Sequence, residues 1–188
     1  MHPDLERVLF TAGQIQERIA ALARQIDRDY AACPGLVLVA VLKGSVFFLT
    51  DLSRALSLPL RLDFLAISSF ASSPGGGRVR IEKDLDLDIT GQHVLLIEDI
   101  VDTGFTLRYL LETLAARHPA TLQVCTLLDK TSRRLLPVPV HYRCFEIPDR
   151  FVVGYGLDYQ QLYRNLPDLG ILRGEIFRPE SPESSPSA

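Results

Sequence analysis

Acids, hydroxyls and a glycine gather directly after an apolar run in the middle of the chain. Residues 94–97 are all aliphatic, and the polar cluster that follows contains Glu98, Asp99, Asp102, Thr103, Gly104 and Thr106. Leucines then recur at helical spacing over residues 107–114. This pattern predicts a strand buried on both faces, then a polar turn, then a helix, with the reactive side chains gathered at the turn.

The polar turn suits a phosphorylated sugar. Backbone N–H groups at the start of a helix are unpaired and lie at the positive end of the helix dipole, so they favour a phosphate. Thr103, Gly104 and Thr106 add hydroxyls and close backbone approach. Glu98 and Asp99 would repel a phosphate directly, but they suit the two hydroxyls of a ribose and a Mg²⁺ that bridges them to a diphosphate. A turn that merely caps a helix would not explain two acids at the end of a buried strand.

The segment from Glu98 to Gly104 resembles the phosphoribosyl diphosphate (PRPP) signature of the type I phosphoribosyltransferases, and most closely that of their hypoxanthine-guanine branch. It is not a Walker loop, because no Gly-Lys-Ser/Thr follows, and Gly154 and Gly156 lack the third glycine of a dinucleotide fingerprint. The resemblance implies that the ribose and its phosphate are bound by Glu98, Asp99, Asp102, Thr103, Gly104, Phe105 and Thr106.

A second turn follows the buried strand predicted over residues 36–42. Its residues, Lys43-Gly44-Ser45, resemble the pyrophosphate loop of the same family, in which the peptide before the lysine is often cis. The resemblance implies that Lys43 and Gly44 bind pyrophosphate. Taken alone, a Lys-Gly turn after a strand is more often plain surface, so the interpretation depends on the other motifs.

Lys130 lies two residues after a strand predicted over residues 122–128, in the motif Leu128-Asp129-Lys130. The family places a lysine at the matching position, where it donates to the 6-oxygen of a purine. A lysine donor cannot accept from the 6-amino group of adenine, so the resemblance implies a 6-oxopurine substrate. A solvated lysine beside Arg133 and Arg134 is the alternative that the strand alone would favour.

Residues 151–159, which read Phe-Val-Val-Gly-Tyr-Gly-Leu-Asp-Tyr, resemble the base-binding segment of the family over their whole length. The resemblance implies that Phe151 stacks on the purine and that the backbone of Val152 contacts its edge. It also implies that Asp158 holds Mg²⁺ through water and that Arg164 binds pyrophosphate. The alternative is that the apolar residues here belong to the core and that Asp158 is a turn residue.

The elements around these motifs carry their own signals. Thr11 and Gln14 form a capping box ahead of apolar residues at helical spacing, which predicts an amphipathic helix. Strands are predicted over residues 60–68 and 78–81, joined by a Ser-, Pro- and Gly-rich loop over residues 69–77.

Strands that alternate with helices indicate an α/β fold with a mostly parallel twisted sheet flanked by helices. Such sheets bind ligands at the carboxyl ends of their strands, where Lys43, Glu98 and Lys130 fall. The resemblance also implies a small hood and a mobile loop that begins at Ser69 and Phe70. The family normally has tyrosine after that serine, so Phe70 is a departure from its pattern.

Composition limits the other possibilities. With 188 residues and 47% apolar content, the chain suits one domain, which we expect over residues 1–178, followed by a disordered tail over residues 179–188. The net charge of −3 gives no general attraction to nucleic acid, and the longest apolar run is too short to cross a membrane. Three widely spaced cysteines indicate neither a disulfide framework nor a zinc site and favour a reducing cytoplasm.

We therefore expect a hypoxanthine-type phosphoribosyltransferase of purine salvage that converts PRPP and a 6-oxopurine into a mononucleotide and pyrophosphate. Asp102 is the expected catalytic base and Mg²⁺ the expected cofactor, with Glu98, Asp99 and Asp158 as its ligands. The resemblance also implies a homo-oligomer, either a dimer or a tetramer. The alternatives are a PRPP-sensing regulator, which would usually carry extra nucleic-acid-binding surface, and an enzyme for another base such as xanthine, adenine or a pyrimidine. The ranking of hypoxanthine, guanine and xanthine stays open.

Overall fold

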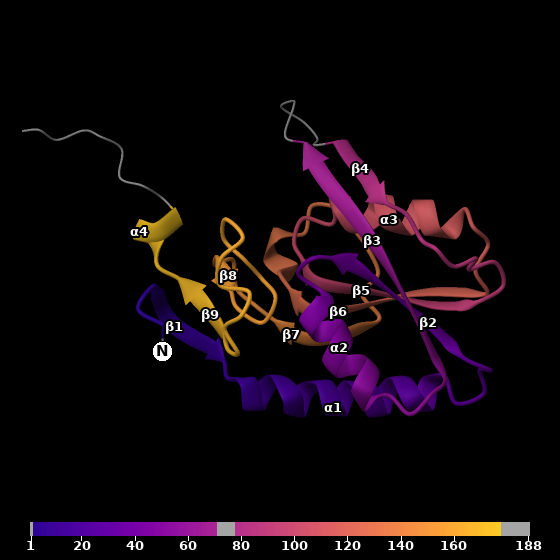
Figure 1. Ribbon diagram of the computed structural model, residues 1–188. Coiled ribbons are helices and arrows are strands. Elements are labelled where there is room, and N and C mark those ends of the chain that lie inside the picture. The colour runs from indigo at the N-terminus through magenta and orange to yellow at the C-terminus, as the bar shows by residue number, and fades with distance from the viewer. Residues whose placement is uncertain (1, 71–77, 178–188) are drawn as a thin grey trace, which may run out of the picture.

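The computed structural model describes residues 2–70 and 78–177, which form a large sheet, a small sheet and the helices around them (Figure 1). The large sheet has six strands, all parallel except the edge strand β4. Their order is β4 (Arg78–Lys83), β3 (Leu60–Phe70), β2 (Leu36–Leu42), β5 (His93–Val101), β6 (Thr121–Asp129) and β7 (Tyr142–Glu146). The predicted α/β fold with a mostly parallel sheet is confirmed.

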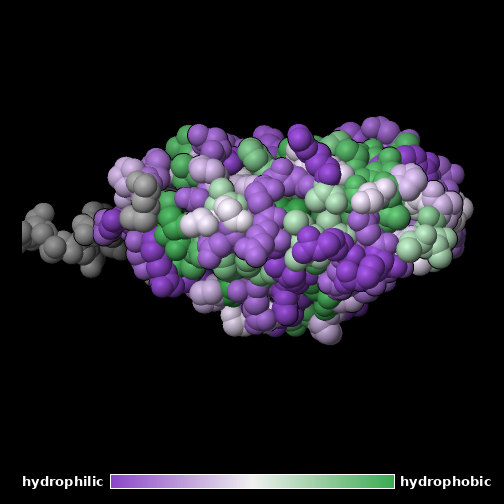
Figure 2. Space-filling model, turned by 90° about the horizontal axis from the view of Figure 1, so that it is seen from below, coloured by the Kyte–Doolittle hydropathy of each residue, from purple (hydrophilic) through white to green (hydrophobic). Residues whose placement is uncertain are grey.

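Helices cover both faces of this sheet because its central strands are apolar on both sides. Alternate residues of β2 point to opposite faces: Leu38 packs with α1 (Ala12–Asp29) and α2 (Val46–Ala55), whereas Val39 packs with α3 (Phe105–Ala115). The capping box predicted at Thr11 is present at the start of α1. On the α1 side of the molecule, hydrophilic side chains predominate with hydrophobic ones scattered among them (Figure 2), as expected for an amphipathic helix.

A small antiparallel sheet lies beside the large one and corresponds to the expected hood (Figure 1). Its strands are ordered β1 (Leu5–Phe10), β9 (Leu169–Leu172) and β8 (Val152–Val153), and the short helix α4 (Gly174–Phe177) follows. The sequence analysis did not predict β1. This strand forms because it pairs with β9. Since β9 lies more than 150 residues further along the chain, no local sequence pattern indicates the pairing.

Several strands were predicted too short, two of them at the site. Strand β5 continues to Val101, so Glu98 and Asp99 lie within its last four residues instead of in the turn, and the turn proper is residues 102–104. Strand β3 continues through Ser69 and Phe70, which pair with β4. The rest of the predicted loop, residues 71–77, and the predicted disordered tail lie outside the described residues.

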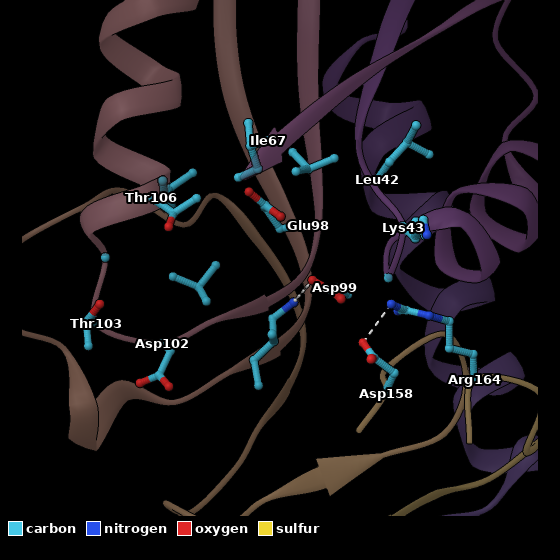
Figure 3. Close-up of a pocket in the computed structure, with 16 residues that line it drawn as sticks. Leu42, Lys43, Ile67, Glu98, Asp99, Asp102, Thr103, Thr106, Asp158 and Arg164 are labelled. Atoms are coloured by element: carbon cyan, nitrogen blue, oxygen red, sulfur yellow. Dashed lines mark hydrogen bonds and ion pairs between the residues drawn. The ribbon is translucent and has the colours of Figure 1, made fainter. Parts of the chain in front are cut away.

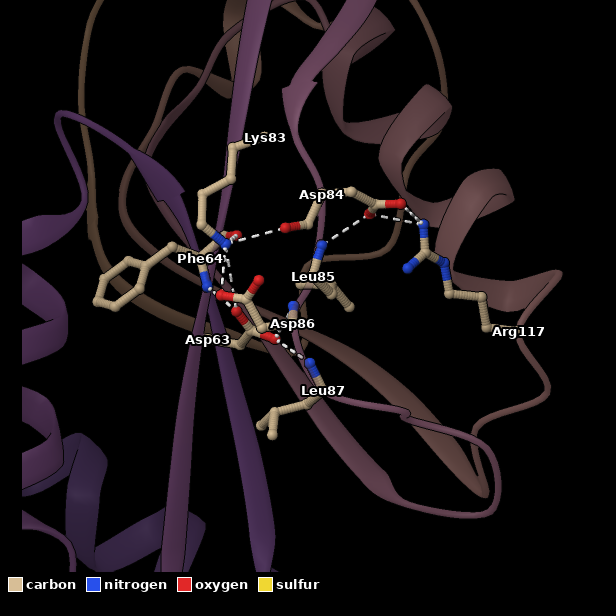
Figure 4. Close-up of polar contacts among 8 residues, drawn as sticks. All are labelled: Asp63, Phe64, Lys83, Asp84, Leu85, Asp86, Leu87 and Arg117. Carbon is tan, nitrogen blue, oxygen red and sulfur yellow. Dashed lines mark hydrogen bonds and ion pairs between the residues drawn. The ribbon is translucent and has the colours of Figure 1, made fainter.

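A buried carboxylate fixes the point where β4 leaves the large sheet (Figure 4). Asp63 of β3 is only 3% exposed, and its carboxylate accepts hydrogen bonds from the backbone N–H groups of Asp86 and Leu87 at 2.9 and 2.8 Å. Lys83 at the end of β4 lies 3.7 Å from the same carboxylate. The β3–β4 hairpin is therefore anchored at its base by charge-assisted hydrogen bonds.

Among the described residues, no helix is both long and apolar enough to cross a membrane.

Candidate active site

A cavity of about 340 Å³ opens at the carboxyl ends of β2 and β5, the edge at which parallel α/β sheets bind ligands (Figure 3). It brings together three segments that the sequence analysis had singled out separately. The predicted residues that line it are Lys43, Gly44, Glu98, Asp99, Asp102, Thr103, Gly104, Thr106, Asp158 and Arg164. Its apolar lining, which includes Ile67 of β3, was not predicted from the sequence.

The two acids at the end of β5 lie in an environment that disfavours their charge. Glu98 is 6% exposed, and burial together with the charge of Asp99 raises its pKa well above the usual range. Burial also raises the pKa of Asp99 to about 6, although the Ile100 amide, 2.8 Å from Asp99 Oδ1, opposes this rise. Adjacent carboxyls of this kind, one buried and one half-buried, are typical of sites that bind a cation or hydroxyl donors.

Asp102 lies in the turn after β5 with its carboxylate at the cavity wall (Figure 3). Its Oδ1 accepts no hydrogen bond but forms an ion pair with Arg133, whose Nε is 3.1 Å away. Its backbone carbonyl accepts a hydrogen bond from Nε of Arg134 at 3.1 Å. The sequence alone identifies both arginines only as neighbours of Lys130. Their positions three and four residues after a strand-end lysine were the available signal.

The segment that follows β6 donates hydrogen bonds to the turn of residues 102–104, which is the turn expected to bind phosphate. The carbonyl oxygen of Thr103 accepts hydrogen bonds from the N–H groups of Leu135 and Leu136 at 3.0 and 3.1 Å. Gly104 has a φ of +93°, and a Cβ there would lie 2.9 Å from the Leu136 carbonyl oxygen. Glycine is thus required both for the backbone conformation and for the space. Phe105 starts α3, is 47% exposed and does not line the cavity, so only its backbone can serve the site.

The loop after β2 approaches the acids closely. The peptide bond between Leu42 and Lys43 is cis, the form that this family often has and that the sequence alone left open. A Cβ on Gly44 would overlap the carboxylate of Asp99, so glycine is what allows the two segments to meet.

Asp158 and Arg164 lie on the same side of the cavity as Lys43, across from Thr103 and Thr106, and pair with each other at 2.7 Å (Figure 3). Arg164 Nη1 also donates to the carbonyl oxygen of Gly156 at 2.7 Å, and Asp158 accepts from the N–H of Gln161 at 2.8 Å. These contacts fix a cation beside an anion at the mouth of the cavity, a suitable arrangement for receiving a diphosphate with its metal.

The residues expected to bind the base lie outside this cavity. Lys130 is 7% exposed and its Nζ lies 3.7 Å from Asp149. Phe151 stacks on Phe177, with ring centroids 4.9 Å apart, and Val152 is buried in β8. The structure therefore gathers the residues expected to bind the sugar, the phosphate and the pyrophosphate, whereas Lys130, Phe151 and Val152 do not line this cavity.

Comparison with known proteins identifies relatives of this chain. A family model for the phosphoribosyl transferase domain matches residues 9–160. The hypoxanthine-guanine phosphoribosyltransferase of Mycobacterium avium is 51% identical over 181 residues, which cover 93% of this chain and 89% of the relative. The hypoxanthine phosphoribosyltransferase of Haemophilus influenzae is 48% identical over 166 residues, covering 87% and 93% respectively.

The fold is shared as well. A solved structure of hypoxanthine phosphoribosyltransferase from Trypanosoma cruzi, in complex with the product IMP, matches with a TM-score of 0.89 and 42% identity. The match covers 94% of this chain and 98% of that one. The chain therefore belongs to the phosphoribosyltransferase family, in its hypoxanthine-guanine branch.

Proposed function

We propose that this protein transfers the 5-phosphoribosyl group of PRPP to hypoxanthine or guanine and releases pyrophosphate, with Mg²⁺ as cofactor. The products are IMP and GMP, and the reaction belongs to purine salvage. The observation that carries the proposal is the single cavity in which acids suited to a ribose, a phosphate-binding turn and a pyrophosphate loop meet. The named relatives support the choice of base.

The donor set of the cavity fits Mg²⁺. Glu98, Asp99 and Asp158 supply hard oxygen atoms, yet residues 2–70 and 78–177 contain no group of three or more side chains placed to hold a metal together. Mg²⁺ is usually bound through one or two carboxylates, and water and substrate phosphates complete its coordination shell. These acids therefore suit Mg²⁺ better than zinc, which prefers nitrogen and sulfur ligands. When bound, the ion neutralises the diphosphate charge and offsets the repulsion between Glu98 and Asp99.

Each protein segment has one task in the transfer. The bond from ribose C1 to pyrophosphate breaks ahead of attack by purine N9, so the ribosyl centre becomes oxocarbenium-like and the main work is electrostatic. Lys43, Gly44 and Arg164 hold the departing pyrophosphate, which leaves with the bonding electrons. As N9 donates its electron pair to C1, the N7 proton passes to the carboxylate of Asp102.

The remaining groups position the substrates. Glu98 and Asp99 bind the ribose hydroxyls, while Thr103, Gly104, Thr106 and the backbone N–H of Phe105 hold the 5-phosphate at the start of α3. Lys130 donates to the 6-oxygen of the purine, Phe151 stacks on the ring and the Val152 backbone contacts its edge. Ser69 and Phe70, at the end of β3, help to exclude water from the diphosphate.

We also propose that residues 1–178 form one domain that assembles into a dimer or tetramer and works in the cytoplasm. One structure of the Trypanosoma cruzi enzyme concerns the role of its C-terminal region in the oligomeric state, which supports a homo-oligomer. Light scattering coupled to size-exclusion chromatography would give the number of subunits.

One experiment tests the activity. Purified protein with PRPP and Mg²⁺ is incubated with hypoxanthine, guanine, xanthine, adenine or uracil, and pyrophosphate release is measured. Release with hypoxanthine or guanine is expected. Release with none of the five bases, from protein that is folded and binds PRPP, would refute the proposed function.

A further inference from the structure

Four side chains of alternating charge link the expected base site to the expected catalytic base. Arg133 Nε lies 3.1 Å from Asp102 Oδ1, and Arg133 Nη1 lies 3.3 Å from Asp149 Oδ1. The same Asp149 oxygen lies 3.7 Å from Nζ of Lys130. The order is therefore Asp102, Arg133, Asp149 and Lys130, with a cation between the two acids and an acid between the two cations.

The two middle side chains of this series, Arg133 and Asp149, each pair with two partners. Asp149 presents a single oxygen to two cations, and Arg133 divides its guanidinium between two carboxylates. Among the four side chains, that of Lys130 is 9% exposed, whereas the other three are 39% to 54% exposed. Arg133 and Asp149 can therefore rearrange in solvent at little cost, but the buried ammonium of Lys130 always needs an oxygen partner.

We propose that Arg133 and Asp149 couple recognition of the purine 6-oxygen to release of Asp102, an inference that rests on the proposed function. In the free enzyme, Arg133 occupies the carboxylate of Asp102. When a 6-oxopurine draws Lys130 towards its oxygen, Asp149 is left with Arg133 as its cation. Arg133 then pairs with Asp149, and Asp102 is free to accept the N7 proton. Arg133 and Asp149 act as positioning residues in this scheme.

The coupling follows from competition for a limited number of charges. While Lys130 neutralises Asp149, Arg133 gains little by leaving Asp102. Once Lys130 has moved, an unpaired Asp149 attracts Arg133, and the equilibrium shifts by the difference between the two pairings. A base without a 6-oxygen cannot trigger this shift, so the scheme would favour 6-oxopurines in the chemical step as well as in binding.

Two surface variants test the scheme. Asp149→Asn keeps the size of the side chain and removes its charge, whereas Arg133→Gln removes the charge and shortens the side chain. Both positions are about half exposed, so both variants should fold. Single-turnover rate constants are measured at saturating PRPP, Mg²⁺ and base, with hypoxanthine and with unsubstituted purine, which has N7 and N9 but lacks the 6-oxygen. Arg117→Gln is the matched control, because Arg117 pairs with Asp84 at 2.7 Å and lies away from the cavity.

In Arg133→Gln, Asp102 is free with either base, so the rate with purine should rise and the ratio of hypoxanthine to purine should fall about three- to fivefold. In Asp149→Asn, Arg133 keeps Asp102 as its sole acid, so the rate with hypoxanthine should fall by a similar factor. The double variant should have the same rate constants as Arg133→Gln, because Asp149 acts on Asp102 only through Arg133, which is already removed. The control should leave the ratio unchanged.

Two results would overturn the coupling. One is an unchanged ratio in Arg133→Gln, and the other is a double variant slowed by the full factor of Asp149→Asn. A merely structural role would lower the rates with both bases equally, in step with a lower melting temperature. Failure of the proposed function is a separate outcome, because the wild-type protein would then form no IMP from hypoxanthine at all.

Discussion

Replacing Asp99 by asparagine should stabilise the free protein while weakening its binding of PRPP. Asp99 lies at the end of β5, half-buried next to Glu98, and burial raises its pKa from 3.8 to about 6. An asparagine keeps the shape and can still accept the 2.8 Å hydrogen bond from the Ile100 N–H. It removes the charge that the folded state disfavours. The site is thus expected to sacrifice stability for binding.

The size of the effect follows from the pKa difference between folded and unfolded protein. Because the pKa of Asp99 is raised in the folded state, the contribution of Asp99 to the free energy of unfolding is most favourable below about pH 4. It falls as the pH rises towards 6 and is constant above that. A difference of about two pKa units corresponds to about 3 kcal/mol. The new amide N–H₂ group needs partners in a half-buried site, so we expect a net gain of about 1–3 kcal/mol at pH 8, or roughly 2–10 °C in melting temperature.

The assay is thermal unfolding of wild type and Asp99→Asn at pH 4 and pH 8, with and without PRPP and Mg²⁺. The variant should melt higher at pH 8, the advantage should shrink at pH 4, and ligand should raise its melting temperature less than that of wild type. Asp88→Asn provides a control of opposite sign, because hydrogen bonds from Thr90 lower the pKa of Asp88 and its charge is favoured in the folded state. A lower melting temperature of Asp99→Asn at pH 8, by the same amount at both pH values, would refute the reasoning.

Four further outcomes are expected from steady-state kinetics. Excess chelator should abolish pyrophosphate release, because PRPP cannot lie against three acids without a cation, and full activity in chelator would contradict the metal site. Asp102→Asn should lower kcat by roughly a hundredfold or more with little change in KM for PRPP, and an unchanged kcat would exclude it as the general base. Lys130→Ala should raise KM for the base far more than KM for PRPP, and adenine should be at least about a hundredfold worse than hypoxanthine; comparable turnover of adenine would remove the role of Lys130. Phe70→Tyr should change kcat/KM by less than about fivefold and Phe70→Ala should lower it, whereas a gain above about thirtyfold in Phe70→Tyr would show that the usual tyrosine hydroxyl matters.

The sequence by itself determined which segments carry chemistry and where in a sheet they lie. The strand, turn and helix around residues 94–114 follow from local hydrophobic periodicity, and the helix start at Thr11 follows from hydrogen bonds that span three residues. Placement of the functional side chains at the carboxyl ends of β2, β5 and β6 then follows from the connection rules of parallel sheets. These signals are local or topological, and so they can be read without coordinates.

Only the tertiary structure decided how the ends of these elements meet. Strand β5 runs on to Val101 because neighbouring β6 continues to pair with it, and β1 exists because β9 returns to it from the far end of the chain. The closeness of Gly44 to Asp99 is likewise a product of packing between segments distant in sequence. The same holds for the polar partners of the site. Arg133 reaches Asp102, and Asp149 reaches the buried ammonium of Lys130, because a side chain pairs with whatever charge the folded chain brings within a few ångströms, and sequence spacing does not encode that distance.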